Sequence, residues 1–294
     1  MPHPITLALR AEGPPDGQPI LFIHGWTLNG TAEAHDFEPV FSSNLIPRPS
    51  PEKRGYRRLY VDLPGHGASP SAASCGTTDL DDMLTALSRF VETEILPARF
   101  LVVGTSAGGL FARAVAMRFE GFVSGLLLRV PVVETRDKDR DVDAFVAVIE
   151  DSAVLERWVP AGLKGYVGEV AVQTVGYVQR AVERAEKVVR PAVEAADQGG
   201  LDAIRGDDER YCLRGPLHSA ARPFKRPTLI IAGRQDSVVG WRDAWGLTSA
   251  YPRASFVVMD RAGHGLPVGE GEEGLFRALV GEWLGRVEEE KGTA

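Results

Sequence analysis

Cysteines and long apolar runs are both scarce in this chain of 294 residues. Its two cysteines, Cys75 and Cys212, lack the C-x-x-C spacing, so neither a disulfide framework nor a thiolate zinc site is indicated. No apolar run approaches the length of about 18 residues that a membrane-spanning helix requires. The first ten residues lack the basic start and long apolar middle of a secretory signal peptide. These absences favour a cytoplasmic location.

An excess of positive charge is also missing. The chain carries 33 basic and 40 acidic side chains, giving a net charge of −7 and a pI of about 5.5. Such a balance argues against nucleic acid and anionic membrane surfaces as partners. The hydrophobic content of 44% is ordinary for a globular enzyme, and the length suffices for one large domain with an insertion. We therefore expect a small-molecule substrate, while the oligomeric state stays open.

The most informative motif is Gly104-Thr-Ser-Ala-Gly108. It follows the apolar run 100–103 and precedes the small-residue, helix-compatible run 109–116. A G-x-S-x-G sequence in this strand–turn–helix context is typical of a nucleophile elbow. A serine on so sharp a turn needs neighbours without bulk, because its backbone is strained. The motif predicts Ser106 as a nucleophile, although an ordinary strand-to-helix turn could carry the same five residues.

Two further polar residues follow Ser106 at the ends of later strands. Asp236 ends an apolar run in Gly-Arg-Gln-Asp, and His264 ends the next in Gly-His. The carboxyl ends of parallel strands line one edge of a sheet, so we expect these three side chains to meet there. The alternatives for the acidic residue are Glu134 and Asp137, just beyond an earlier predicted strand.

Each of these residues has a role in nucleophilic catalysis. A serine hydroxyl needs a base, and the imidazole of His264, flanked by glycines, exchanges protons near neutral pH. Asp236 would orient that imidazole and stabilise its protonated form. The backbone amides of Trp26 and Ala107 are the expected oxyanion hole. This chemistry requires no cofactor and no metal.

Together these motifs make the sequence similar to the α/β-hydrolase family, across nearly its whole length. The resemblance rests on His24-Gly25-Trp26, Asp62-Leu-Pro-Gly-His-Gly-Ala-Ser69, the Ser106 elbow, Asp236 and His264. It implies the α/β-hydrolase fold, a mostly parallel eight-stranded sheet flanked by helices, with an inserted helical cap. The implied core is 1–132 with 223–294, and the implied cap is 133–222. Asp62, His66 and Ser69 are expected to stabilise a turn, and His24 to be a structural hydrogen-bonding residue.

Apolar periodicity predicts the individual elements. We expect strands at 5–10, 20–24, 58–62, 100–103 and 125–132, and two more beginning at Thr228 and Ser255. We expect a short helix and a loop within 36–57, a helix over 79–95 capped by Asp79, insertion helices over 142–157 and 166–196, and later helices over 241–249 and 275–287.

The elbow serine narrows the activity that the resemblance implies. Epoxide hydrolases and haloalkane dehalogenases carry aspartate at that position, so they are disfavoured. The sequence is similar to small microbial hydrolases with a helical cap, which include esterases and meta-cleavage-product hydrolases. We expect a serine hydrolase that cleaves a small to medium carboxylic ester, thioester or lactone through an acyl-enzyme. The alternatives are a C–C bond hydrolase acting on a diketone and a low-turnover ligand receptor.

Overall fold

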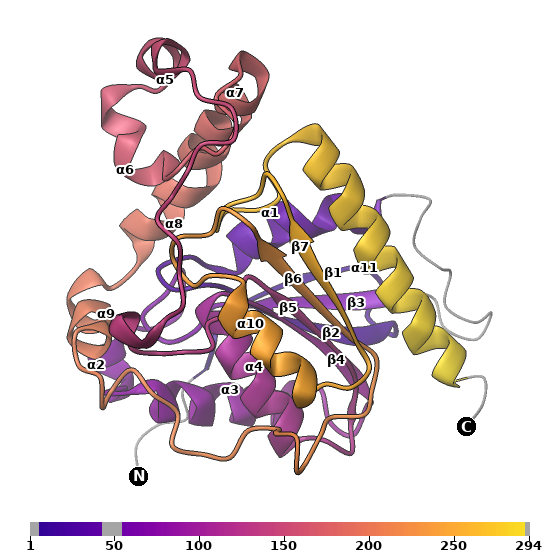
Figure 1. Ribbon diagram of the computed structural model, residues 1–294. Helices are drawn as coiled ribbons and strands as arrows, with labels where there is room; N and C mark the ends of the chain where they lie inside the picture. The colour runs from indigo at the N-terminus through magenta and orange to yellow at the C-terminus, as the bar shows by residue number, and fades with distance from the viewer. Residues whose placement is uncertain (1–5, 43–54, 292–294) are drawn as a thin grey trace.

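A central sheet organises the molecule (Figure 1), in a computed structural model that describes residues 6–42 and 55–291. The described part of the sheet has seven strands in the order β1-β3-β2-β4-β5-β6-β7, and every neighbouring pair is parallel except β1 with β3. The strands are β1 (Leu9–Glu12), β2 (Gln18–Ile23), β3 (Tyr56–Val61), β4 (Phe100–Thr105), β5 (Val123–Arg129), β6 (Thr228–Gly233) and β7 (Ala254–Met259).

The apolar character of the central strands follows from their position. Every residue of β2, β4, β5 and β6 is buried. Strands that carry helices on both faces have this pattern, because neither face meets water. The chain passes from β2 to β3 on one side and returns to β4 on the other side of β2. A crevice forms at such a switch point, beyond the carboxyl ends of the strands.

The expected α/β-hydrolase architecture is confirmed, with differences at the ends of its strands. The described sheet has seven strands and not eight. The apolar runs of the sequence also number seven, and the eighth strand was implied by the resemblance alone. β1 begins at Leu9, later than predicted, and residue 5 lies outside the described residues. β5 ends at Arg129, before the predicted end, because Val130 turns the chain with a φ of +41°.

Helices cover both faces of this sheet (Figure 1). Phe90 and Phe111 bury one face under α3 and α4, while Phe37 and Trp283 bury the other under α1 and α11. The helices outside the insertion are α1 (Gly30–Phe41), α2 (Ala72–Cys75), α3 (Leu80–Glu94), α4 (Ala107–Arg118), α10 (Arg242–Gly246), the 3₁₀ turn η4 (Leu247–Ser249) and α11 (Glu270–Lys291).

Helix boundaries follow their capping residues. The Asp79 side chain accepts a hydrogen bond from the Asp82 amide at 2.9 Å, which fixes the start of α3 as predicted. α10 with η4, and α11, agree with the later helix predictions. α1 begins at Gly30, before the predicted range, because the Asn29 side chain caps it through the Ala32 amide. Residues 43–54 of that prediction lie outside the described residues, and β3 begins at Tyr56, inside the predicted loop.

Residues 133–222, between β5 and β6, form what we call the inserted segment. Figure 1 shows that α5, α6 and α7 of this segment stand away from the sheet. The apolar contacts of these three helices are few and centre on the buried Val178, whereas Leu201 and Ile204, later in the segment, pack into the main core. Its helical elements are η1 (Asp137–Asp139), α5 (Ser152–Trp158), η2 (Ala161–Leu163), α6 (Lys164–Val167), α7 (Val175–Arg184), the π-helical η3 (Ala185–Val189), α8 (Arg190–Ala195) and α9 (Gln198–Arg205).

The helix predictions were correct only in part in this segment. Residues 142–150 are not helical, and α5 begins at Ser152, where Asp151 caps it through the Val154 amide. The earlier stretch is rich in β-branched residues, which lose rotamer freedom in helices. The second predicted helix is interrupted because Gly168, with a φ of +67°, ends α6. It resumes only at Val175.

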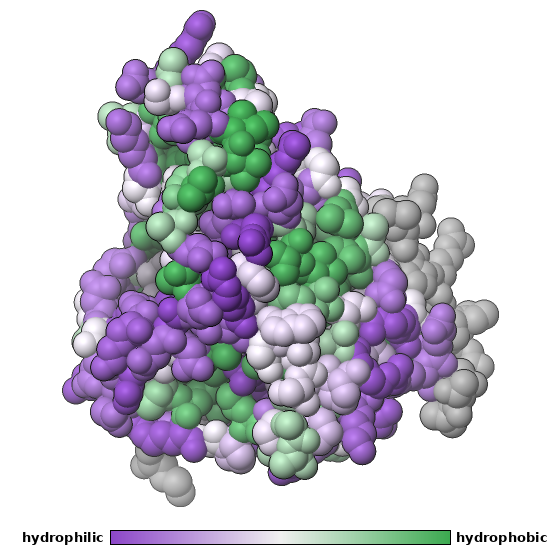
Figure 2. Space-filling model, in the orientation of Figure 1, coloured by the Kyte–Doolittle hydropathy of each residue, from purple (hydrophilic) through white to green (hydrophobic). Residues whose placement is uncertain are grey.

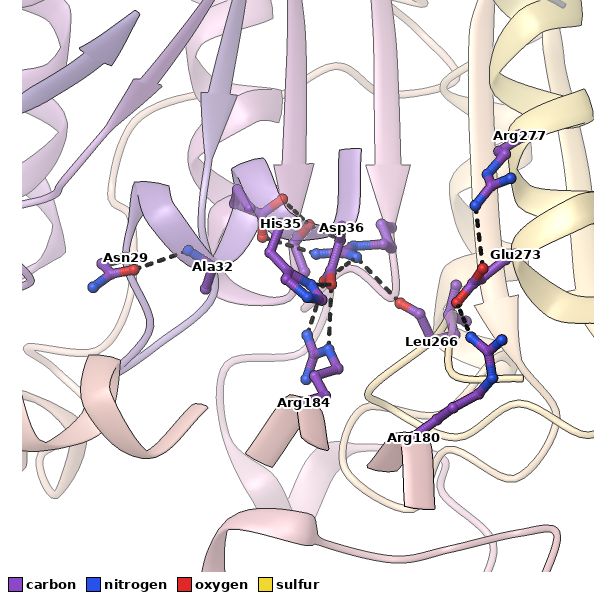
Figure 3. A network of polar contacts seen from close by, with 12 residues as sticks. Asn29, Ala32, His35, Asp36, Arg180, Arg184, Leu266, Glu273 and Arg277 are labelled. Atoms are coloured by element: carbon purple, nitrogen blue, oxygen red, sulfur yellow. Dashed lines mark hydrogen bonds and ion pairs between the residues drawn. The ribbon is translucent and has the colours of Figure 1, made fainter. Parts of the chain in front are cut away.

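Charged side chains join the inserted segment to the sheet domain. Figure 3 shows Arg184, from the end of α7, reaching Asp36 of α1, and Arg180 reaching Glu273 of α11. These contacts measure 2.8 and 2.9 Å. Asp36 also binds the buried Arg129 at 2.7 Å, so one carboxylate bridges both parts of the molecule.

Hydrophilic side chains cover much of the outer face in Figure 2. Within the described residues no helix is both long and apolar enough to traverse a bilayer.

Candidate active site

Ser106 lies on the sharp turn between β4 and α4. Its φ of +53° and ψ of −119° are strained for a residue with a side chain. The glycines on either side of this turn are required because a side chain there would collide with the backbone. A Cβ on Gly104 would lie 2.3 Å from the Gly108 carbonyl oxygen, and one on Gly108 would lie 2.1 Å from the Ile23 carbonyl oxygen. The turn therefore brings the hydroxyl to the carboxyl edge of the sheet, next to the end of β2.

The structure brings the three predicted polar side chains together. His264 Nε2 lies 3.0 Å from Ser106 Oγ, and His264 Nδ1 lies 2.9 Å from Asp236 Oδ2. Asp236 is ionised and can only accept at Oδ2, so Nδ1 carries the proton and donates it. Nε2 is then free to accept the hydrogen bond from the Ser106 hydroxyl. The hydroxyl thus faces a basic nitrogen.

The surroundings of Asp236 keep it charged. Burial raises the pKa of this carboxyl, but the attraction of His264 and the hydrogen bonds to it lower the pKa, which ends below its usual value. Oδ1 accepts the Val238 and Val239 amides at 2.9 and 3.0 Å, leaving Oδ2 for the imidazole. These three bonds fix the carboxylate in the orientation that holds the ring.

The two alternative acidic residues lie elsewhere. The Asp137 carboxylate pairs with the guanidiniums of Arg140 and Arg205. The Glu134 carbonyl oxygen accepts from Arg140 Nε at 2.9 Å. The Nδ1 position of His264 is already taken by Asp236.

The two amides expected to form an oxyanion hole flank the serine. Ala107 is the first residue of α4, where the helix dipole favours negative charge. Gly25 passes so close that a Cβ there would lie 3.3 Å from Ser106 Cβ, and Trp26 follows it directly. Within residues 6–42 and 55–291, the N–H groups of Trp26 and Ala107 donate to no other group. Both are available to a bound oxygen.

The neighbouring histidines and turn residues support this loop. His24 donates from Nδ1 to the Gly25 carbonyl at 2.8 Å and accepts the Leu63 amide at Nε2. Burial lowers its pKa to about 4, so the ring is neutral and structural, as expected. Asp62 accepts the amides of Gly30 and Ala68, and the Ser69 hydroxyl donates to the Asp62 carbonyl. His66 is buried against the His24 ring.

A cavity of about 600 Å³ opens above Ser106 and His264. Its walls come from both the sheet domain and the inserted segment. Sequence reasoning missed eight charged and aromatic side chains in these walls, because Arg129 ends an apolar strand and the other seven lie in the inserted segment, which shows no motif. They are Arg129, Arg140, Tyr166, Glu169, Tyr177, Arg184, Arg205 and Tyr211. In the described part of the chain, no group of three or more potential metal ligands comes together.

Comparison with known proteins finds similar proteins that align with most of this chain. The family model described as the alpha/beta hydrolase family matches residues 20–278. The chain is 25% identical over 267 residues to pimeloyl-[acyl-carrier protein] methyl ester esterase of Nitrosomonas europaea, covering 87% of this chain and 92% of that one. It is 26% identical over 294 residues to a non-heme chloroperoxidase of Kitasatospora aureofaciens, covering 92% and 93%. An alpha/beta superfamily hydrolase from Oenococcus oeni superposes with a TM-score of 0.76 at 23% identity, covering 96% of both chains.

Proposed function

This chain is an enzyme of the alpha/beta hydrolase family, and on that premise we propose that it hydrolyses small to medium carboxylic esters, thioesters or lactones with Ser106 as nucleophile. The observation that carries the proposal is the pair of contacts, 3.0 and 2.9 Å long, that link Ser106 through His264 to Asp236. A serine hydroxyl aimed at an oriented imidazole is the arrangement that activates it for attack.

In the first step Ser106 Oγ attacks the carbonyl carbon while His264 Nε2 takes the hydroxyl proton. The oxygen of the tetrahedral intermediate carries the negative charge, facing the amides of Trp26 and Ala107. The imidazolium is stabilised by Asp236 and gives its proton to the leaving alkoxide or thiolate. The products of this step are an acyl-enzyme and a free alcohol or thiol.

The second step repeats this chemistry with water. His264 takes a proton from a water molecule, whose oxygen attacks the acyl carbon. Collapse of the second intermediate breaks the bond to Ser106 Oγ, which recovers the proton from His264. A carboxylic acid leaves, and the enzyme returns to its starting state without any cofactor.

The inserted segment, residues 133–222, is proposed to act as the cap over this chemistry. Support comes from the cavity, whose walls include Tyr166, Tyr177 and Arg205 from that segment together with Ser106 and His264. A cap in this position would select a small-molecule substrate. We also propose that the enzyme acts in the cytoplasm, since both cysteines are free thiols, which a reducing compartment preserves.

Replacing Ser106 with alanine tests the proposal. We expect Ser106→Ala to lower kcat/KM on p-nitrophenyl acetate about 10³-fold or more. The melting temperature should stay close to that of the wild type, because alanine keeps the size of the turn residue. A fluorophosphonate probe should label the wild type and not the variant.

The other outcomes exclude this mechanism or identify a different function. Unchanged ester turnover in Ser106→Ala would exclude this mechanism. Labelling without ester turnover, but with cleavage of a vinylogous 1,5-diketone, would assign C–C bond hydrolysis. Labelling without multiple turnover on any substrate would indicate a ligand receptor that keeps the fold.

A further inference from the structure

The candidate active-site cavity contains more arginine than its catalytic chemistry requires. Four guanidiniums line it, from Arg129, Arg140, Arg184 and Arg205. Two of these are neutralised in the core, because Arg129 pairs with both Glu33 and Asp36, and Arg184 pairs with Asp36. The other two share a single carboxylate.

That shared carboxylate is Asp137. It binds Arg140 Nη1 at 2.7 Å and also binds Arg205 Nη2, while 65% of its own side chain is exposed. Two guanidiniums with one carboxylate leave one positive charge. Glu169, the acidic residue in the cavity wall, accepts from the Ser237 hydroxyl and pairs with neither arginine in the described structure. A local excess of positive charge therefore lies at this end of the cavity.

The two arginines differ in what they can still bind. Each nitrogen of the Arg140 guanidinium already donates to a protein group, namely the carbonyl oxygens of Glu134, Thr135 and Val238. Arg205 still has donors that bind no protein group. Across the described chain its Nε and Nη1 donate to no protein group, and 29% of its side chain is exposed. Both bidentate modes of a guanidinium use Nη2 together with Nε or Nη1, and Nη2 keeps a second N–H beside the one that Asp137 accepts, so Arg205 can still bind a carboxylate through two donors.

Tyr211 adds a second donor beside Arg205. The Arg205 guanidinium carbon lies 4.4 Å from the centre of the Tyr211 ring, which orients both groups. Burial raises the pKa of Tyr211, so its hydroxyl stays protonated, and no group of the described residues accepts from it. The same ring packs edge-on against Trp26 at 5.0 Å, which connects this subsite to the candidate oxyanion hole.

We propose that Arg205 and Tyr211 form a carboxylate-binding subsite, so that the preferred substrates are esters carrying a second, ionised carboxyl group. This inference rests on the proposed ester hydrolysis at Ser106. The carboxylate can belong to the acyl part, as in a monoester of a dicarboxylic acid, or to the alcohol part, as in the acetate of a hydroxy acid. In either case it displaces water from a positively charged, partly buried site.

Two matched pairs of substrates separate these sources. Monomethyl adipate and methyl hexanoate differ only in a terminal carboxylate against a methyl group, on the acyl side. 4-Acetoxybenzoate and 4-tolyl acetate differ in the same way on the alcohol side. We expect kcat/KM to favour the anion about tenfold or more in one pair, and that pair shows where the charge lies.

Three variants assign the preference to the subsite. Arg205→Gln should lower kcat/KM for the preferred anion about 10- to 100-fold, mainly through KM, and change the neutral partner less than about threefold. Arg205→Lys should restore part of the loss, and Tyr211→Phe should cause a smaller loss. Asp137→Asn should act in the opposite direction and increase the preference, because it leaves both arginines unneutralised. If the ion pair between Asp137 and Arg205 were only structural, Asp137→Asn would cause the same loss of kcat/KM as Arg205→Gln.

Binding measurements keep this proposal separate from the proposed function. Adipate or 4-hydroxybenzoate should bind the Ser106→Ala protein in calorimetry, and Arg205→Gln in that background should abolish the binding. If the probe labels Ser106 and the wild type hydrolyses esters, but kcat/KM is equal within both substrate pairs, the subsite is overturned and the hydrolase proposal stands. Binding that survives Arg205→Gln would also overturn it. Absence of labelling and turnover would refute the hydrolase, and the calorimetry would still decide the subsite.

Discussion

In the sheet domain, β2, β4, β5 and β6 are buried along their whole length, whereas helices α5 to α7 of the inserted segment bury only a small apolar cluster around Val178. The segment has two kinds of attachment. Ion pairs from α7 join it to the sheet domain, such as Arg184 with Asp36 and Arg180 with Glu273, and Leu201 and Ile204 of α9 pack into the main core. Apolar burial gives a rigid arrangement because it involves many contacts at once, while exposed ion pairs such as Arg180 with Glu270 contribute little each.

The two parts of the molecule also contribute different residues to the candidate site. Ser106, Asp236 and His264 all lie on the sheet domain, at strand ends whose positions the buried sheet fixes. The inserted segment contributes cavity walls, including Arg205 and Tyr211. A rigid scaffold suits groups that must keep hydrogen-bond geometry, and a segment outside the sheet suits groups that select a substrate.

The largest effect is expected at Gly108, where an added side chain would come very close to the backbone of the sheet domain. In Gly108→Ala the new Cβ would lie 2.1 Å from the Ile23 carbonyl oxygen, so the end of β2 must move. That strand leads into Trp26, and displacement of the elbow by about 1 Å is enough to cost about 100-fold in rate. We expect at least that loss of esterase kcat/KM, with about 3 kcal/mol less free energy of unfolding in urea.

A glycine of the inserted segment provides the matched control. Nothing lies within 4 Å of the Cβ position of Gly176 in α7. Gly176→Ala should therefore stabilise the protein slightly, by about 0.5 kcal/mol, and leave esterase activity on small neutral esters unchanged. Equal losses in both variants would show that the two regions are equally tightly packed.

The next effect is expected on stability, at the buried ion network beneath the cavity. Arg129 is 1% exposed and binds both Glu33 and Asp36. Arg129→Met removes the partner of Glu33 and leaves a buried carboxylate unpaired, which typically costs about 3–5 kcal/mol. Urea unfolding followed by circular dichroism measures this loss.

The comparison variant for this network lies at the surface of the junction. Arg180→Gln breaks the pairs with Glu270 and Glu273, in which the Arg180 side chain is 37% exposed. Exposed pairs contribute about 1 kcal/mol or less, so the free energy of unfolding should change little. A loss as large as that of Arg129→Met would mean that the junction is as important for stability as the core.

The same contrast explains how much of the fold the sequence could predict. The central strands are continuous apolar runs, and caps such as Asp79 mark helix starts, so local pattern and tertiary position agree there. In the inserted segment residues 142–150 have apolar side chains but no helix, because Val148 and Ile149 form backbone hydrogen bonds with Ala171, and Gln173 donates to Ile149. Such a pairing depends on a distant partner and leaves no periodic signal.

The candidate site divides in the same way. Ser106, Asp236 and His264 are recognisable because each follows a strand in a short motif, and the parallel sheet determines where strand ends meet. Arg205 and Tyr211 have no motif, and their proximity to Trp26 depends on how α9 packs. Asp137 illustrates the limit, since its sequence position suited a catalytic acid and the structure pairs it with two arginines.

The last expected effect is a pH dependence of stability that originates in the sheet domain. Burial lowers the pKa of His24 to about 4, below its ordinary value of 6.5. Between these values the unfolded chain binds more protons than the folded one, so the stability is complete above pH 6.5 and is lost as the pH falls toward 4. The loss attributable to this one ring is at most about 3 kcal/mol. Urea midpoints measured at pH 7, 6 and 5 should fall, and His24→Gln should flatten that slope. An unchanged slope in His24→Gln would show that the inserted segment or other groups control it.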